Sequence, residues 1–455
     1  MVRLVFPLLL VLAVPAWAEE FVFYPKILNT TTGLPASPGQ FVSAEKCAYC
    51  HPLQYEQWKG SMHANALADP LFQAVWRESS RETGGRTDRF CAGCHAPVGA
   101  LTEQVWIRES GQIVIDPRAD EGVTCDFCHS VVSVKLLEKG GNPGNSGLAV
   151  EPEGAKQGPY ADAHSTFHAT AYSDVHTRSE FCGACHNVFH PANNTAIART
   201  YEEWKGSEYA RAGIQCQDCH MVPPEVAARV ADTMEKAVRT GLTSVFDTER
   251  TPFFDHDFTG ANAAVTTLLN QWTRANEARL RLQSAARLEL VVPDTVAPSR
   301  VLEVGVRVEN ARAGHNLPTS MTELREMWLE VTVRDLGKDG QVVFQSGGLG
   351  EGRRLDPKAR RFGAQAMDAD GRPTWKPWRI ARIVRDTSIP PRGAVTERFE
   401  ISLPPGAKGP FEVVARLLYR SLPQGVADAY LGRPGWKVPL VEMAATRAEV
   451  GVAGE

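Results

Sequence analysis

Ten cysteines occur in five pairs, and each pair has the spacing Cys-x-x-Cys and is followed directly by a histidine. The five motifs are Cys47, Cys50 and His51; Cys91, Cys94 and His95; Cys125, Cys128 and His129; Cys182, Cys185 and His186; and Cys216, Cys219 and His220. Two thiols three positions apart can bond the two vinyl groups on one edge of a porphyrin, and the next residue can turn its imidazole beneath the ring to bind iron. The pattern therefore predicts five covalent haem c groups, with the cysteines as cofactor anchors and the five histidines as proximal ligands.

Two other uses of paired cysteines compete with this interpretation. Ten cysteines in an exported protein can form disulfides, and Cys-x-x-Cys pairs can build zinc ribbons. Neither explains the histidine after every second cysteine, nor why every cysteine of the chain lies inside a motif. Haem attachment explains both.

The sixth position of each iron decides what the protein can do. A second histidine there gives a low-spin iron that is closed to substrates, whereas an open position lets small molecules bind. Seven histidines lie outside the motifs. We predict distal ligands, and therefore metal-binding residues, at His63, His168, His176, His256 and His315.

Some of these assignments have alternatives. His256 has apolar neighbours that could cover a porphyrin, but its two flanking aspartates fit an exposed histidine equally well. His315 lies on a tight loop that could join two halves of the molecule, and an ordinary surface histidine is the alternative. His190 lies four residues after His186, too close to reach the opposite face of the same haem, although it could serve a neighbouring one. His190 and His164 are therefore left as spares.

The amino end has the three parts of a secretory signal. Arg3 precedes the apolar run 4–14, and Ala16-Trp17-Ala18 provides small residues where a signal peptidase cuts. We predict a signal peptide over 1–18 and a mature chain that begins near Glu19, with a retained amphipathic anchor as the alternative. Later stretches are too short or too polar to form a membrane span. These features predict a periplasmic or extracellular protein, on the side of the membrane where haem c is attached.

Composition adds two limits. The chain has 455 residues, a formal net charge of -4 and 43% hydrophobic residues, which is ordinary for globular proteins and allows two or three domains. It lacks runs of lysine or arginine, so we expect no nucleic-acid partner.

The periodicity of apolar residues changes near residue 285. Before it, we expect a mainly helical or irregular multihaem cytochrome c domain over 19–285, with one helix opening at Pro223-Pro224 and running to Val238, and another capped by Asn262 and continuing through Trp272. After it, apolar residues alternate over 302–308 and 327–333, Asp339-Gly340 is a turn, and further strands are indicated at 342–344, 398–403 and 411–419. The fold class is therefore α+β and multidomain, with an all-β antiparallel sandwich over 286–455.

A short sequence repeat occurs in two predicted helical segments. Trp58-Lys-Gly-Ser61 is repeated as Trp204-Lys-Gly-Ser207, with an aromatic residue three positions before each tryptophan. The second copy has Tyr209 where the first has His63. A shared helical segment beside a haem is the hypothesis, and coincidence in a short window is the alternative.

Three segments carry a resemblance to a known family. SEFCGACH at 179–186, GIQCQDCHM at 213–221 and GHNLPT at 314–319 resemble the multihaem cytochromes c related to cytochrome c-554 and hydroxylamine oxidoreductase. The likeness covers most of the mature chain, including the appended sandwich. It implies closely stacked haems that form an electron path, with axial roles for residues at positions such as His63, His168, His176, His256 and His315.

Departures from that family decide between activities. Pentahaem nitrite reductases carry Cys-x-x-Cys-Lys at the catalytic haem, but all five motifs here end in histidine. Hydroxylamine oxidoreductases have more haems and a cross-linked tyrosine. We therefore predict an exported pentahaem cytochrome that relays electrons between periplasmic or cell-surface redox partners. One alternative is an oxidoreductase that acts on a small nitrogen or sulfur compound at one five-coordinate haem, and another is an oligomer or haem-lined filament.

Overall fold

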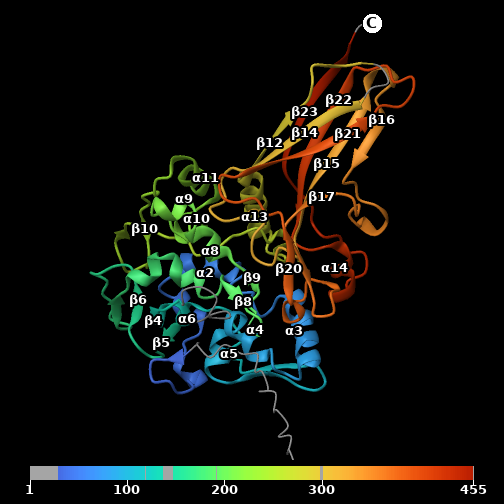
Figure 1. Ribbon diagram of the computed structural model, residues 1–455. Helices are drawn as coiled ribbons and strands as arrows, with labels where there is room; N and C mark the ends of the chain where they lie inside the picture. Colours follow the sequence, from blue (N-terminus) through green and yellow to red (C-terminus); the bar gives the residue numbers. More distant parts are fainter. Residues whose placement is uncertain (1–28, 118, 137–146, 191, 298–300, 454–455) are drawn as a thin grey trace, which may run out of the picture.

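The computed structural model describes residues 29–117, 119–136, 147–190, 192–297 and 301–453. The predicted signal peptide, 1–18, lies outside the described residues. Figure 1 shows a rounded part built of short helices and an elongated sheet-rich part that extends from it, with the carboxyl end of the chain at the far tip of the sheets.

Short elements make up the rounded part. Its helices are α1 (Ala44–Ala48), α2 (Pro52–Lys59), α3 (Pro70–Thr83), α4 (Asp88–His95), α5 (Pro97–Leu101), α6 (Cys125–His129), α7 (Ser179–Gly183), α8 (Thr200–Lys205), α9 (Glu208–Arg211), α10 (Cys216–His220), α11 (Pro224–Thr233), α12 (Ala263–Leu268) and α13 (Trp272–Ala285), with single turns η1 (Pro38–Gln40) and η2 (Asp174–Thr177). Its strands are β1 (Asn29–Thr30), β2 (Val105–Ile107), β3 (Ile113–Ile115), β4 (Val131–Val134), β5 (Leu148–Val150), β6 (Lys156–Gly158), β7 (Thr170–Tyr172), β8 (Val188–Phe189), β9 (Ala196–Ala198), β10 (Gly241–Leu242) and β11 (Glu249–Arg250).

Every motif contributes to a short helix, which sets the direction of its side chains. α6 and α10 coincide with the third and fifth motifs, and α4 ends at the histidine of the second. Residues three apart lie on one face of a helix, so the two cysteines of a motif point to the same side. The hydroxyl of Thr124 caps α6 by accepting from the backbone N–H of Phe127.

Apolar residues of the rounded part form several small clusters and leave a large space between them. Separate groups surround Val98 and Phe127, Tyr201 and Trp204, and Trp76. Among them lies a cavity of about 1760 Å³ that residues from all five motifs line. The chain alone therefore does not fill the middle of this part.

Two sheets pack face to face in the elongated part. Its elements are β12 (Ala286–Val291), β13 (Thr295–Val296), β14 (Val301–Asn310), β15 (Glu326–Asp335), η3 (Leu336–Lys338), β16 (Gln341–Ser346), η4 (Glu351–Arg353), β17 (Arg360–Phe362), β18 (Ala364–Met367), β19 (Pro373–Thr374), η5 (Pro377–Arg379), β20 (Arg382–Asp386), β21 (Ala394–Ser402), β22 (Phe411–Arg420), α14 (Gln424–Tyr430) and β23 (Val441–Val452). One sheet has the order β12-β14-β21, the other β13-β23-β22-β15-β16 with β17 also on β15, and both contribute to one core.

The alternating pattern predicted these strands correctly. The apolar residues of 302–308 and 327–333 lie on β14 and β15 and are completely or almost completely buried. Asp339 and Gly340 both have positive φ, which confirms the turn before β16. Alternation works here because one face of each strand packs on the core while the other does not.

Other expectations need correction. The carboxyl-terminal part is not all-β or purely antiparallel, because it contains α14 and because β13 pairs with β23 in parallel. The helix that opens at Pro224 ends at Thr233, since Met234 takes a left-handed conformation, and Val238 is 81% exposed beyond it. Asn262 is confirmed as a cap, but α12 ends at Leu268.

A polar clamp joins α3 to the sheet-rich part. Glu78 accepts from Lys376 and Tyr430, and Glu82 pairs with Arg379. α3 and α14 lie side by side at this joint (Figure 1). α13 ends at Ala285 and β12 begins directly after it, but the predicted division into domains at 285/286 stays a prediction. Among the helices that the structure describes, none is long and apolar enough to cross a membrane.

Candidate cofactor site

The cavity has the size and lining of a site for several prosthetic groups. Its volume, about 1760 Å³, exceeds the roughly 300–1000 Å³ of pockets for one small molecule. All ten cysteines lie within the described residues and form no disulfide. The described residues also contain no group of three or more His, Cys, Asp or Glu side chains arranged to hold a metal ion such as zinc.

Four histidine pairs face each other across the cavity, and each pair joins one motif histidine to one histidine from outside the motifs. The ring centres are separated by 6.4 Å for His51 and His168, 6.3 Å for His63 and His186, 6.3 Å for His129 and His256, and 6.3 Å for His220 and His315. Four of the five distal positions predicted from the sequence are thus brought opposite a motif histidine.

The spacing of these pairs matches two imidazoles on one metal ion. A histidine nitrogen binds a metal at about 2 Å, and the centre of a five-membered ring lies roughly 1.1 Å behind that nitrogen. Two such ligands on opposite sides of one ion should therefore have ring centres about 6.2–6.3 Å apart. The observed separations of 6.3 and 6.4 Å agree, so these residues fit an iron held between them.

Hydrogen bonds leave the correct nitrogen available in most of these residues. The Nδ1–H of seven histidines donates to a backbone carbonyl: His51 to Thr243, His95 to Ala66, His129 to Gln157, His220 to Thr259, His168 to Ala169, His256 to Phe254 and His315 to Asn316. A carbonyl can only accept, so the proton is on Nδ1 and the lone pair of Nε2 is available for a metal.

Burial keeps several of these imidazoles neutral. Desolvation, followed by the nearby His186 and His95, lowers the pKa of His63 to about 3. Desolvation likewise lowers the pKa of His256 and His220 to about 3. A neutral imidazole is the form that binds metals, so burial favours ligation at neutral pH.

The structure does not bring His176 opposite a motif histidine at this spacing. Its ring stacks beside His129 at 5.5 Å, its Nε2 bonds the carbonyl of Cys128 and its Nδ1 contacts the hydroxyl of Ser173. Both nitrogens are therefore used by protein, and His129 already faces His256. The geometry gives no support to the predicted axial role of His176.

The spare histidines have no axial geometry either. Nδ1 of His190 accepts from the backbone N–H of Ala192, and its Nε2 contacts the carbonyl of Trp378. His164 lies exposed at the rim of the cavity.

His95 differs from the other motif histidines. Its ring stacks on Phe72 at 3.7 Å with an interplanar angle of 3°. All twelve histidines are among the described residues, and none of the others faces His95 at the spacing of the four pairs. The second motif is therefore the one motif whose histidine has no other described histidine opposite it at this spacing.

Thiol contacts give the order of the motifs in space. Three pairs of thiols lie close enough to shift each other's pKa: Cys47 and Cys125, Cys94 and Cys185, and Cys182 and Cys216. Cys128 also lies near Cys182 and Cys185. The first, third, fourth and fifth motifs thus form a continuous series, and the second joins it at the fourth.

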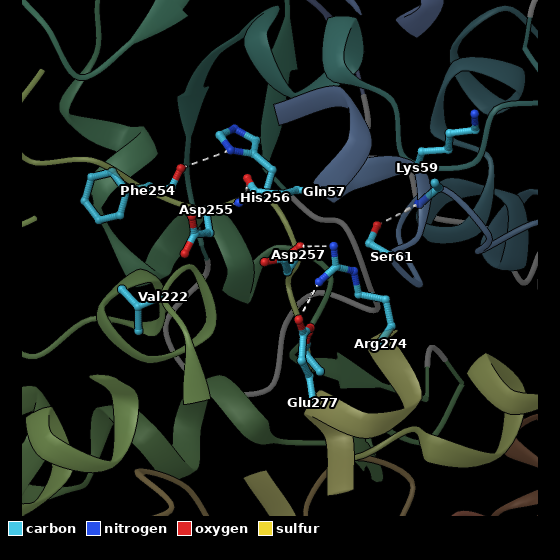
Figure 2. Close-up of polar contacts among 12 residues, drawn as sticks. Gln57, Lys59, Ser61, Val222, Phe254, Asp255, His256, Asp257, Arg274 and Glu277 are labelled. Atoms are coloured by element: carbon cyan, nitrogen blue, oxygen red, sulfur yellow. Dashed lines mark hydrogen bonds and ion pairs between the residues drawn. The ribbon is translucent and has the colours of Figure 1, made fainter. Parts of the chain in front are cut away.

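The segment that carries His256 is held by charged residues on both sides. Arg239 pairs with Asp255, and Gln57 bonds both Asp255 and the backbone N–H of His256. Arg274 pairs with Asp257 at 2.5 Å and with Glu277 at 2.6 Å. It lies between the two carboxylates (Figure 2). These contacts fix the backbone from which His256 projects (Figure 2).

A second network fastens the segment of His168. Arg250 pairs with Asp162, which lies six residues before His168, and with Asp247, three residues before Arg250 itself. The hydroxyl of Tyr160 donates to the carbonyl of Pro252. These contacts join two segments about 90 residues apart in the sequence. Both segments lie beside the first motif, because His51 bonds Thr243 and faces His168.

His315 comes from the sheet-rich part, directly after β14. The amide of Asn310 donates to its carbonyl, and Glu203 of α8 accepts from the backbone N–H of Asn316 and from Thr319. This loop therefore carries a side chain of the second part into the cavity of the first.

Glu323, farther along the same loop, supports a prediction about pH. Burial and the nearby Asp386 raise its pKa from 4.5 to about 7, and its Oε2 lacks a hydrogen-bond partner among the described residues. The folded state binds this proton more tightly than the unfolded state, so stability is fully present below pH 4.5 and declines as the pH rises to about 7. We expect Glu323→Gln to be more stable than the parent at pH 8 by on the order of 3 kcal/mol, and nearly equal at pH 4. Denaturant titrations at both pH values test this, and an equal difference at both would contradict it.

The Trp-Lys-Gly-Ser sequence repeat is also a repeat in the structure. Trp58 and Trp204 are the second-last residues of α2 and α8. Their Nε1–H groups donate to the carbonyls of Val123 and Ile214 at 2.8 and 2.9 Å. Each of these carbonyls lies two residues before the first cysteine of a motif. Both tryptophans therefore anchor the chain where it enters a motif, the third and the fifth respectively.

This anchoring can be tested by removing one donor. We expect Trp204→Phe to lower the free energy of unfolding by about 1–3 kcal/mol, because the buried carbonyl of Ile214 loses its partner. Trp272, which is 60% exposed, provides the control: Trp272→Phe should leave the unfolding midpoint unchanged. Equal effects of the two substitutions would count against the anchoring role.

Comparison with known proteins agrees with this geometry. The family model for cytochrome c554 and c-prime matches residues 46–130. Cytochrome c-554 of Nitrosomonas europaea is 28% identical over 158 residues, which cover 33% of this chain and 59% of that protein. The match thus spans about three fifths of the curated relative. The chain is therefore similar to the multihaem cytochromes c.

A solved structure shows the same fold over nearly the whole chain. The crystal structure of a penta-heme cytochrome c552 from Thermochromatium tepidum matches with a TM-score of 0.61 and 20% identity, covering 90% of this chain and 99% of that one. The fold of this chain, including its sheet-rich part, is therefore shared with a solved structure.

Several residues of this candidate site have no signal in the sequence. The carbonyls that orient the histidines belong to ordinary residues such as Thr243 and Gln157, and any residue offers a carbonyl. Phe72 lies in an apolar helix face with no feature that pairs it with His95. The tryptophan repeat was the one detectable hint of these supporting contacts.

Proposed function

We propose that this protein is an exported pentahaem cytochrome c that relays electrons between redox protein partners. The observation that carries the proposal is the set of four histidine pairs, spaced for one iron each and belonging to motifs whose thiols lie close together. When bound, haem c supplies one-electron redox centres.

The chain's own residues have three roles in this proposal. The ten motif cysteines anchor the five groups, and the five motif histidines ligate from the proximal side. His63, His168, His256 and His315 ligate from the distal side. Backbone carbonyls hold seven of these nine imidazoles by Nδ1, which fixes their orientation and raises their basicity.

The remaining assignments follow from the sequence. Residues 1–18 are proposed as the signal peptide, 19–285 as the haem domain and 286–455 as the sheet-rich domain that supplies His315. A periplasmic or cell-surface location fits both the leader and the attachment of haem c. Size measurement of the purified holoprotein tests whether it forms oligomers or filaments.

Intact mass and spin state together test the proposal. After expression with the haem maturation machinery, the mature chain should gain the mass of five haems and keep them through a denaturing gel. The ferric protein should show four low-spin irons. A chain with only its amino-acid mass would end the proposal.

A second candidate function depends on His95 alone. Because no histidine faces it, the iron of the second motif would keep an open position, as in an oxidoreductase for a small nitrogen or sulfur compound. The family likeness favours electron transfer. Cyanide or nitrite should remove one high-spin signal, and turnover of a small substrate is required before catalysis is assigned.

A further inference from the structure

One histidine pair differs from the other three in how its rings are held. In the pairs of the first, third and fifth motifs, both imidazoles donate Nδ1–H to a carbonyl. Within the described part of the chain, neither ring of His63 or His186 makes such a bond. This pair also has the largest angle between ring planes, 50°, against 36°, 23° and 14° for the others.

An aromatic side chain packs on His63 where the others have a hydrogen bond. The ring of Phe258 lies 4.6 Å from that of His63, tilted by 55°, and 5.6 Å from that of His256, nearly edge-on at 77°. The backbone of His63 is itself fixed, because its carbonyl accepts from Val123. Only the rotation of the His63 imidazole is left for Phe258 to determine.

Phe258 is kept in place against a backbone preference. Its φ is 49°, in the left-handed region, which costs a non-glycine residue on the order of 1 kcal/mol. Its neighbours hold it there: Asp257 pairs with Arg274, and the Thr259 hydroxyl donates to Glu277 while the Thr259 carbonyl accepts from His220. Strain that is held from both sides is typical of a functional position.

We propose that Phe258 is a positioning residue that holds His63 twisted by about 50° from His186, in place of the missing hydrogen bonds. The inference rests on the proposed function, in which these two histidines ligate one iron. The fourth site thereby acquires an electronic character distinct from the other three paired sites. The fourth motif lies next to the second, third and fifth motifs. The twisted histidine pair therefore belongs to the motif at which the others meet.

Electron paramagnetic resonance reports the twist directly. Nearly parallel axial imidazoles give a rhombic low-spin ferric spectrum, whereas crossed imidazoles give a signal with a much larger maximal g value. The wild-type holoprotein should therefore show one low-spin signal with a larger maximal g value than the other three. Four similar rhombic signals in the wild type would overturn the inference without any variant.

Substitution then identifies the residue. Phe258→Leu should move the large-g signal toward the rhombic region and leave the number of low-spin irons unchanged, and Phe258→Tyr should retain the wild-type signal. Phe258→Ala gives a second test should leucine disturb the fold. Phe72→Leu is the matched control, because Phe72 packs on His95 and should change only the signal of the second motif. An unchanged large-g signal in both Phe258→Leu and Phe258→Ala would overturn the inference.

A further variant separates this inference from the proposed function. His63→Ala should convert one low-spin iron, the one with the large-g signal, to high spin. If it does so while the Phe258 variants change nothing, ligation stands and the positioning role is wrong. If His63→Ala leaves all low-spin signals in place, His63 is not a ligand and the proposed ligation itself fails.

Discussion

Replacement of His315 by alanine is expected to convert one of the four low-spin irons completely to high spin. His220 would lose the imidazole that lies 6.3 Å from its own, and no other histidine among those described could reach the vacated position. Its loss should also raise the reduction potential of that site, since an imidazole donor stabilises the ferric form. Optical and paramagnetic resonance spectra measure the spin change, and a potentiometric titration measures the potential.

Controls for this prediction come from histidines of the same chain. His164→Ala should leave the spectrum unchanged, because this side chain is exposed and faces no motif histidine. His176→Ala should also preserve all four low-spin signals, since both its nitrogens bond protein atoms. Free imidazole should restore the lost signal in His315→Ala. Loss of a low-spin iron in His176→Ala instead would return His176 to the set of ligands.

Removal of Arg420 should give the largest loss of stability, about 3–5 kcal/mol. Arg420 pairs with Glu326 at the junction of β22 and β15, and their side chains are only 1% and 6% exposed. Arg420→Met leaves the Glu326 carboxylate buried without its cation, which is far more costly than deletion of the whole pair. Denaturant titration followed by the far-ultraviolet dichroism of the strands measures the change.

A matched surface pair calibrates this effect. Arg416 lies on the same strand and pairs with Glu330 and Glu442, but its side chain is 39% exposed. Arg416→Met should cost no more than about 1 kcal/mol. The double variant Arg420→Met with Glu326→Leu should recover most of the lost stability. If Arg420→Met and Arg416→Met lowered the free energy of unfolding equally, the buried pair would stabilise the fold no more than the surface pair.

The parts of this protein that could be predicted from sequence are those that local spacing encodes. The motifs are complete within five residues, and the strands of the sheet-rich part follow from alternation within about ten. Helix ends were less accurate: the apolar face at 226–238 predicted four turns, but Met234 turns left-handed and ends the helix early.

Partnership between distant residues could not be derived in this way. His63 and His186 are 123 positions apart in the sequence, and only the fold shows that they face each other. The sequence predicts His176 and His168 alike as ligands, yet the Nε2 of His176 bonds the carbonyl of Cys128. Four of the five predicted distal histidines have a geometry that fits ligation. The sequence did not indicate which motif each of them faces.

Each distal histidine is separated from its motif along the chain, and this has a consequence for how the protein matures. As the polypeptide emerges from its amino end, the histidine pair of the first motif is complete at His168 and that of the fourth at His186. The third waits for His256, and the fifth for His315, which follows β14. The order of completion during synthesis is therefore first, fourth, third and fifth, and the last step depends on a segment from the sheet-rich part.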